Sequence, residues 1–254
     1  MPQHLTLITG ASRGLGHAMA QQRLQAGHRL LTISRSATVL PVPEGAVHED
    51  WQADLAEPGP LARRLRAWLA GIDALTLASV TLIHNAGVIS KLAPLSAYTA
   101  DEDAELAGAL RVGLEAPLVL SAAFLHATAA WASAAVPRKL LFISSGLGRS
   151  AMAGSASYCA AKAGMDHLAR ALALEEAATP HGARVASMAP GVIDTDMQGQ
   201  LRAADPALFA DHSRFVGLQA GGLLDSPAQA ATKVLRLLDR ADFGQTAITD
   251  VRQA

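Results

Sequence analysis

Short apolar runs alternate with longer runs rich in alanine and leucine along almost the whole chain. The short runs hold β-branched residues and leucine with few polar interruptions, a pattern typical of strands covered on both faces. They predict strands over residues 5–9, 29–34, 77–84, 139–144, 184–189 and 246–251. The longer runs predict helices over residues 15–26, 61–69, 101–110, 118–135, 157–178 and 227–238.

This regular alternation of strands and helices defines the fold class. Strands that are each followed by a helix form a parallel sheet with the helices packed on its faces. We therefore expect an α/β fold, a single-domain Rossmann-type doubly wound parallel sheet with helices on both faces, over residues 1–254. Such sheets bind ligands at the carboxyl ends of their strands, so functional motifs should directly follow strands.

Composition narrows the kind of core and the kind of partner. Half of the residues are hydrophobic, which excludes a disordered chain. About 54 alanines against 4% aromatic residues indicate a core in which small side chains bring backbones close together. The formal net charge of -1 provides no general attraction to nucleic acid or to an anionic membrane, and neither partner is expected.

The longest uncharged stretch, residues 116–137, has the length of a membrane span. Pro117, Ser121 and Thr128 interrupt it and most of the rest is alanine, which favours a buried helix. No basic and apolar leader precedes the first strand, so a cytoplasmic location is expected. The nine histidines are scattered without ligand spacing and Cys159 is the single cysteine, expected in the core, so no metal site is predicted.

A glycine-rich turn follows the first predicted strand and precedes the first helix, with the spacing G-x3-G-x-G. Gly10 permits a tight turn, Gly14 lets a phosphate approach the backbone, and Gly16 lets the helix pack on the strand. Backbone N–H groups at a helix N-terminus bind a pyrophosphate well. The loop therefore predicts a dinucleotide site formed by Gly10, Ser12, Arg13, Gly14, Leu15 and Gly16. The alternative is a purely structural turn.

Two arginines indicate which dinucleotide would bind. Arg13 lies inside the glycine loop, and Arg35 lies at the end of the second predicted strand, where NAD-selective folds place an acid. Guanidinium groups suit a 2′-phosphate by geometry and charge, so NADP(H) is the expected cofactor. The alternative for either arginine alone is a solvated surface charge.

A second group of residues carries the chemistry. Ser145 follows a predicted strand, and Tyr158 and Lys162, four residues apart, share one face of a predicted helix. A nearby ammonium lowers the pKa of a tyrosine, which would then exchange a proton with a carbonyl oxygen. Ser145 is placed to hydrogen-bond the same oxygen. The alternative is an ordinary pair of helix residues.

Together these residues resemble the short-chain dehydrogenase/reductase family over essentially the whole chain. The matching motifs are Thr9-Gly10-x3-Gly14-x-Gly16, Asp54-Leu55, Asn85-Ala86-Gly87, Ser145, Tyr158-x3-Lys162 and Pro190-Gly191-Val192-Ile193-Asp194-Thr195. Ser145 precedes Tyr158 by thirteen residues, the usual separation in that family.

The resemblance implies roles for residues outside the catalytic trio. It places Asp54 and Leu55 at the adenine and Asn85, Ala86 and Gly87 along the cofactor groove. It gives Lys162 a second role in holding the nicotinamide ribose. It also implies that the nicotinamide end of the cofactor is bound by Pro190, Gly191, Val192, Ile193 and Thr195. Asp54 as a helix cap and residues 190–191 as a plain turn are the alternatives.

The last third of the chain carries a finer resemblance. The segments Tyr158-Cys159-Ala160-Ala161-Lys162, Leu172-Ala173-Leu174-Glu175-Glu176, Asp194-Thr195-Asp196-Met197-Gln198 and Phe243-x6-Asp250 are similar to the sepiapterin reductases and the benzil-reductase-type members of the family. This resemblance implies that Asp250 anchors a pterin-like substrate. The alternative is a surface acid without a role in binding.

Two positions depart from the family pattern. Gly113 stands where family members carry an asparagine that supports a water-linked proton relay to the lysine, so that relay is in question. His84 begins the Asn-Ala-Gly turn where a second asparagine is common, and we expect it to be a satisfied strand-end histidine.

The substrate region is expected after the nicotinamide motif. Residues 199–224 interrupt the strand–helix rhythm with Pro206, Gly217, Gly221 and Gly222, which makes them a candidate substrate lid or, alternatively, a surface excursion. Leu147, Met152 and Met197 are candidates for an apolar pocket, although the methionines would equally suit the core. The alanine-rich helix and the Tyr158 helix suggest a self-association face, hence a homodimer or homotetramer.

The sequence thus predicts an NADPH-dependent carbonyl reductase that acts on a small ketone or α-dicarbonyl of the sepiapterin or benzil type. Tyr158 would be the proton donor, Ser145 would orient the carbonyl, and Lys162 would tune Tyr158. Two alternatives stay open. One is a non-enzymatic NADP(H)-binding sensor or scaffold, suggested by Gly113, and the other is an NAD(P)-dependent alcohol dehydrogenase that works in the oxidative direction.

Overall fold

The computed structural model describes residues 2–253 and is built around one sheet of seven parallel strands. The strand order is β3-β2-β1-β4-β5-β6-β7, so the direction of chain progression reverses between β1 and β4. The strands are β1 (Gln3–Thr9), β2 (His28–Ser34), β3 (Val47–Gln52), β4 (Leu77–His84), β5 (Arg138–Ile143), β6 (Arg184–Ala189) and β7 (Ile248–Asp250). This arrangement confirms the predicted doubly wound α/β fold.

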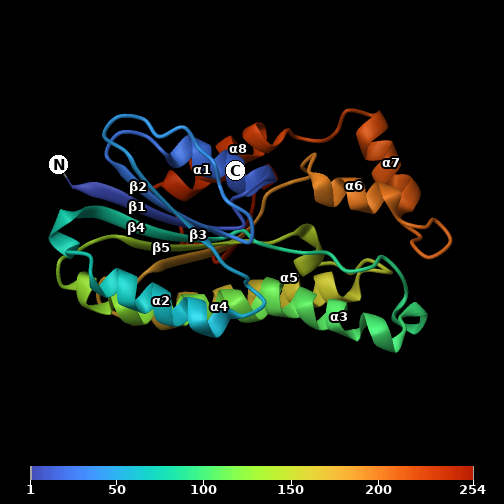
Figure 1. Cartoon of the computed structure of the whole chain (residues 1–254), viewed down its shortest axis with the longest axis horizontal. Helices are drawn as coiled ribbons and strands as arrows, with labels where there is room; N and C mark the ends of the chain where they lie inside the picture. Colours follow the sequence, from blue (N-terminus) through green and yellow to red (C-terminus); the bar gives the residue numbers. More distant parts are fainter. Residues whose placement is uncertain (1, 254) are drawn as a thin grey trace.

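Helices cover both faces of the sheet, as Figure 1 shows. On one face lie α2 (Pro58–Ala70), α4 (Ala116–Thr128) and α5 (Ala156–Ala177), and on the other lie α1 (Gly14–Arg23) and α8 (Pro227–Asp239). Each face has its own apolar core, which is why the central strands are hydrophobic on both sides. The remaining helices are α3 (Asp103–Leu110), α6 (Asp196–Ala203) and α7 (His212–Ala220).

The edge strand β3 was not predicted from the sequence. It reads Val-His-Glu-Asp-Trp-Gln, without the continuous apolar run of the other strands. Its polar side chains have partners on β2, because Glu49 pairs with Arg29, and Asp50 accepts a hydrogen bond of 2.7 Å from Thr32. An edge strand needs apolar residues on fewer positions than a central strand, so its pattern carries a weaker signal.

The uncharged stretch of the sequence forms α4, within a long helical segment that passes from α3 through a π-helical turn (Arg111–Glu115). Length and composition alone would allow residues 100–132 to cross a membrane. However, Leu120, Ala123 and Phe124 have no exposed surface and belong to the core between α4 and the sheet. This packing supports the interpretation of α4 as a core helix.

Gly113 lies in the π-helical turn, where this segment approaches α5. A Cβ atom added at Gly113 would lie 2.9 Å from the Cβ of Ala161, which is closer than normal packing allows. On the neighbouring turn of α5, a Cβ added at Gly164 would lie 2.7 Å from a methyl group of Leu114. Glycine at both positions thus permits a close approach between the two helical segments, directly beside the residue that precedes Lys162.

We predict that Gly113→Ala destabilises the protein by about 1–3 kcal/mol in urea unfolding, because the added methyl group overpacks the contact with Ala161. Gly108→Ala in α3 is the matched control, since a Cβ there meets no atom within 4 Å. Helix propensity alone should make this control more stable by up to about 1 kcal/mol. Equal effects of the two substitutions would contradict the packing interpretation.

Candidate active site

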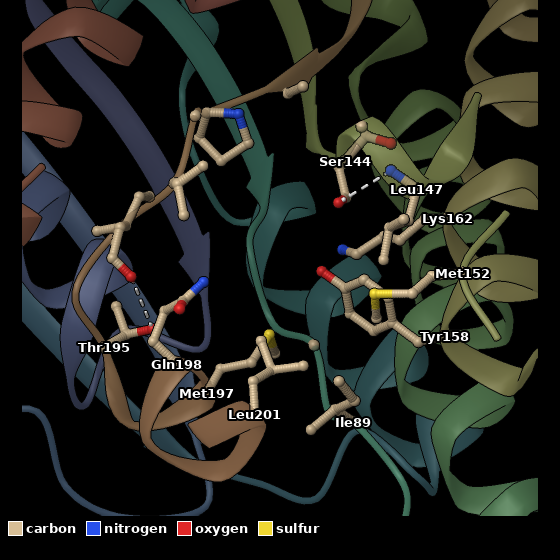
Figure 2. Close-up of a pocket in the computed structure, with 18 of the residues that line it drawn as sticks. Ile89, Ser144, Leu147, Met152, Tyr158, Lys162, Thr195, Met197, Gln198 and Leu201 are labelled. Carbon is tan, nitrogen blue, oxygen red and sulfur yellow. Dashed lines mark hydrogen bonds between the residues drawn. The ribbon is translucent and has the colours of Figure 1, made fainter. Parts of the chain in front are cut away.

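A cavity of about 440 Å³ opens at the carboxyl ends of the central strands, on the side of the sheet where the strand order reverses between β1 and β4. Its polar wall contains residues that follow β4, β5 and β6, and its apolar wall contains residues of α6 and α7. Figure 2 shows Tyr158 and Lys162 pointing into this cavity across from Met197 and Leu201. The predicted catalytic residues and most of residues 190–195 therefore lie around one cleft, at the position where folds of this class bind ligands. Of the predicted glycine-loop residues, Leu15 lines this cleft and the others lie beside it.

The glycine loop is held tightly at the end of β1. Gly10 and Gly14 have positive φ angles of 69° and 58°, which other residues adopt only with strain. A Cβ at Gly16 would lie 2.2 Å from the carbonyl oxygen of Gly10 and 2.4 Å from the Asn85 amide nitrogen. Asn85 donates hydrogen bonds to the carbonyl oxygens of Thr9 and Gly10, at 3.1 and 2.9 Å. These contacts hold the glycine loop, the start of α1 and the residue after β4 in fixed positions relative to one another.

This loop fits the pyrophosphate of a dinucleotide. No side chain caps the N-terminus of α1, so the N–H groups of its first turn lack a side-chain partner. The Ser34 hydroxyl accepts hydrogen bonds from the N–H groups of Ala11 and Ser12, at 2.8 and 3.2 Å, and fixes the loop at the end of β2. A helix N-terminus prepared in this way is a good anion site.

The opposite side of the phosphate site comes from the segment after β6, which contains the predicted residues 190–195. Gly191 has a φ of 86°, and a Cβ at Gly14 would lie 3.4 Å from a methyl group of Thr195. Pro190, Gly191, Val192, Ile193 and Thr195 line the same cavity as Asn85 and Gly87. The glycine loop and this segment therefore face each other across the expected cofactor groove.

The residues expected at the adenosine end lie outside the cavity. Arg35 is exposed at the end of β2, and Arg13 forms an exposed ion pair of 2.9 Å with Asp196 at the start of α6. The Asp54 carboxylate accepts a hydrogen bond of 2.9 Å from the N–H group of Ala56, as an Asx turn. Leu55 is buried in the core, so only its backbone is available to a nucleotide.

The three predicted catalytic residues meet in the cavity. Ser145 follows β5, and its hydroxyl accepts a hydrogen bond of 3.2 Å from the N–H group of Leu147. Tyr158 and Lys162 are on the first turns of α5, and the Lys162 Nζ lies 5.6 Å from the centre of the Tyr158 ring. Lys162 donates a hydrogen bond of 2.7 Å to the carbonyl oxygen of Ile143, at the end of β5.

Burial determines the ionisation of this site. It raises the pKa of Tyr158 to about 12, with a smaller opposing effect of a hydrogen bond to Ser145. The sequence-based expectation that the lysine lowers the pKa of this tyrosine is therefore wrong for the protein without cofactor, because desolvation of the phenolate outweighs any attraction. Tyr158 is protonated at neutral pH and is suited to donate a proton.

Lys162 is also affected by burial. Desolvation lowers the pKa of Lys162 to about 8, and the carboxylate of Asp166, one turn further along α5, opposes this shift. Asp166 is buried and accepts hydrogen bonds from the Ser187 hydroxyl at 2.6 Å and from Arg149 at 3.1 Å. This fixed negative charge helps to keep the lysine protonated at neutral pH.

The apolar part of the cavity contains the three predicted residues Leu147, Met152 and Met197. Sequence reasoning missed Ile89, Leu201 and Phe215, which line it as well. Phe215 belongs to α7 and stacks on Phe209, with ring centres 5.7 Å apart. Cys159 is half-buried against this cluster, close to the Ser155 hydroxyl. Residues 199–224, expected as a lid, thus form the end of α6, a connecting loop and α7 beside the cavity.

The expectation for Asp250 is revised by the structure. Asp250 is buried and does not line the cavity; both of its carboxylate oxygens accept hydrogen bonds from Arg252, which does line it. A substrate would have to displace Arg252 to reach this carboxylate. Arg252 gave no signal in the sequence, because it belongs to no motif and lies beyond the last predicted strand.

His84 is a buried structural residue, as expected. Its Nε2 is 2.9 Å from the Ser121 hydroxyl, and its ring stacks on Phe142. Complete burial lowers the pKa of His84 to about 3, so the ring is neutral at physiological pH. It is not part of the cavity wall.

Comparison with known proteins defines the class. The chain belongs to the short-chain dehydrogenase family: the family profile described as "short chain dehydrogenase" matches residues 4–206. A solved structure, described as a putative NAD(P)-dependent gluconate 5-dehydrogenase from Beutenbergia cavernae with bound NADP, has a TM-score of 0.77 and 25% identity. This comparison covers 99% of the present chain and 96% of that one.

Two curated relatives match over nearly their whole length. Benzil reductase ((S)-benzoin forming) from Bacillus cereus is 30% identical over 243 residues, which covers 94% of this chain and 95% of the relative. Sepiapterin reductase from Meriones unguiculatus is 32% identical over 257 residues, covering 96% and 94% respectively. Both belong to the same oxidoreductase family as this chain, and both were anticipated by the finer sequence resemblance.

We predict that the efficiency of ketone reduction falls as the pH rises through about 8, where Lys162 loses its proton. Tyr158, with a pKa of about 12, stays protonated over this range and causes no inflection there. The measurement is kcat/KM as a function of pH. In Lys162→Arg the remaining activity should lack the inflection, because arginine does not deprotonate in this range. An inflection at the same pH in that variant would contradict the assignment.

Proposed function

We propose that this protein is an NADPH-dependent carbonyl reductase for small ketones or α-dicarbonyls of the benzil or sepiapterin type. The observation that carries this proposal is the protonated Tyr158 beside Ser145 in a half-apolar cavity, with a phosphate-binding loop at its edge. The similarity to benzil and sepiapterin reductases supports the substrate class.

Tyr158, Ser145 and Lys162 each have a separate role in the proposed reaction. When bound, NADPH supplies the hydride that reaches the carbonyl carbon. Tyr158 donates its phenolic proton to the carbonyl oxygen, and the Ser145 hydroxyl hydrogen-bonds the same oxygen and orients the carbonyl group. Lys162 holds the nicotinamide ribose and keeps a positive charge near the phenol, where it stabilises the phenolate left after proton transfer.

Preference for NADPH over NADH is supported by charge at the end of β2. The residue there is the exposed Arg35, whereas an acid would bind the free ribose hydroxyls of NADH. Arg13 lies close by in the glycine loop, although its ion pair with Asp196 must open before it contacts a 2′-phosphate. Exposed ion pairs are weak, so this exchange costs little.

The proposal also covers the oligomeric state of the protein, its location in the cell and the segment that closes over the substrate. Leu118 of α4 and Leu174 of α5 are 49% and 76% exposed among small residues, which supports a homodimer or homotetramer built on these helices. Residues 199–224 act as the substrate lid, supported by the contacts of α7 with the cavity. The core packing of α4 supports a cytoplasmic protein that binds neither membranes nor nucleic acid.

The central prediction concerns Tyr158→Phe, which removes the proton donor and leaves the ring. NADPH consumption with benzil, sepiapterin and simple ketones should fall at least about 100-fold in kcat, whereas NADPH binding should be unchanged. Tyr98→Phe is the matched control, because Tyr98 does not line the cavity. Its hydroxyl donates a hydrogen bond to the carbonyl oxygen of Lys91. Turnover unaffected by Tyr158→Phe would contradict the role of Tyr158 as proton donor. Cofactor binding without turnover in the wild type would favour a non-enzymatic NADP(H)-binding protein.

The cofactor prediction concerns Arg35→Asp. Loss of the guanidinium and gain of an acid should lower the ratio of kcat/KM for NADPH over NADH by at least about tenfold. Arg66→Asp on the exposed face of α2 makes the same charge change away from the cofactor groove and should leave the ratio unchanged. A retained NADPH preference in Arg35→Asp would remove Arg35 from this role.

A further inference from the structure

A network of two arginines and two buried carboxylates links α5 to β7 and the residues that follow it. Arg149 donates hydrogen bonds to the buried Asp166 carboxylate at 3.1 Å and to the carbonyl oxygen of Thr249 at 2.9 Å, and its Nη1 lies 3.9 Å from the Asp250 carboxylate. Asp166 and Asp250 are only 1% and 5% exposed. The network anchors residues 249–252 beside the loop that carries Ser145.

Asp250 in turn holds Arg252. Its carboxylate accepts hydrogen bonds from the backbone N–H group of Arg252 at 2.9 Å, from Nε at 2.9 Å and from Nη2 at 2.6 Å. These hydrogen bonds keep the pKa of Asp250 below its usual value, so the carboxylate is charged. Among residues 2–252, no hydrogen-bond partner is found for the Nη1 of Arg252, and the side chain is 68% exposed.

The arrangement places an arginine side chain at one corner of the cavity, above two buried carboxylates. Two carboxylates lie below the surface and Arg149 lies between them, while the Arg252 guanidinium faces the cavity. The other arginine at the cavity, Arg214, already pairs with Asp211 at 3.7 Å. Asp250 holds the Arg252 side chain in one orientation before a ligand binds, through Nε and Nη2, which leaves Nη1 for a ligand.

Leu201 of α6, Phe215 of α7 and Met152 form an apolar patch on the cavity wall, with Leu201 and Phe215 only 6% and 8% exposed. A ligand whose carbonyl lies at Ser145 and Tyr158 would thus contact an apolar surface and an oriented guanidinium. Arginine donates two parallel hydrogen bonds to a carboxylate with matching geometry. A guanidinium held in place by Asp250 loses little side-chain entropy on binding.

We propose that Arg252 is a specificity-determining residue that binds a carboxylate, and that the preferred substrate is a ketone carrying a carboxylate and an apolar group. This inference deepens the proposed reductase function and rests on it. It also assigns Asp250 a positioning role: the carboxylate orients Arg252 and is occupied by it. Neutral pterins, which would need that carboxylate as an acceptor, should be weaker substrates than aromatic 2-oxo acids.

The test compares benzoylformate with its methyl ester, which keeps the ketone and the phenyl group and lacks the charge. In Arg252→Gln, kcat/KM for benzoylformate should fall at least about tenfold and that for the ester should be unchanged. Arg252→Lys, which keeps the charge and loses the bidentate geometry, should retain part of the preference. Arg236→Gln on the exposed face of α8 is the control and should change neither value. A similar loss for both compounds, or for neither, would overturn the inference.

A binding experiment separates this inference from the proposed reaction. Phenylacetate and phenylacetamide, which contain no ketone, are titrated into the NADP⁺-loaded protein and followed by ligand-observed NMR. Tighter binding of the carboxylate by the wild type, lost in Arg252→Gln, supports the anion site even if no ketone is reduced and the proposed function fails. Equal binding of the two compounds by the wild type overturns the inference even if neutral ketones are reduced.

Discussion

The close contact between the ends of β1 and β4 is the constraint on which the rest of the site depends. The Asn85 amide bridges two carbonyl oxygens at the end of β1, and the backbone of Gly10 approaches Ala86 so closely that a Cβ would lie 2.7 Å from its Cα. β1 and β4 are parallel neighbours, but the chain continues from β1 to β2 on one side of the sheet and from β4 to β5 on the other, so the segments that follow the two strands separate just beyond this contact. This contact fixes the positions of the cleft and of the N-terminus of α1, which no side chain caps, relative to α5 with Tyr158 and Lys162.

Desolvation is the second effect that shapes the site, and it shifts the pKa values of two neighbouring groups in opposite directions. Burial stabilises the neutral form of both, so the pKa of Tyr158 rises and the pKa of Lys162 falls. The Ile143 carbonyl and the Asp166 carboxylate preserve the ammonium by hydrogen bonding and by charge. A protonated phenol next to a protonated amine is the state in which a site donates a proton, which agrees with reduction better than with oxidation.

The end of β7 and the residues after it show how one residue type at a given place in the fold can take a different partner. A position that resembles the pterin-anchoring acid of sepiapterin reductases is present as Asp250, yet in this chain it is engaged by an arginine two residues later. The same carboxylate therefore has a different consequence: it presents a cation to the cavity. The resemblance correctly indicated that Asp250 lies near the site. Its partner, Arg252, decides that the carboxylate is not free to bind a ligand.

The glycine loop, the continuous apolar strands and the i, i+4 pair of Tyr158 and Lys162 could all be predicted from the sequence. Each depends on residues close together in the chain, where strand, turn and helix geometry follow from local backbone preferences. Strand β3 escaped prediction because its polar side chains are satisfied by β2, and a partner strand is not visible in a local pattern.

By itself the sequence determined the fold class, the position of the phosphate loop and the candidate catalytic trio. Only the tertiary structure decided the ionisation of Tyr158, the close packing at Gly113 and the occupation of Asp250 by Arg252. The physical reason is common to all three. Desolvation, steric contact and ion pairing depend on atoms that meet across the fold, such as Arg149 and Thr249, and not on neighbours along the chain.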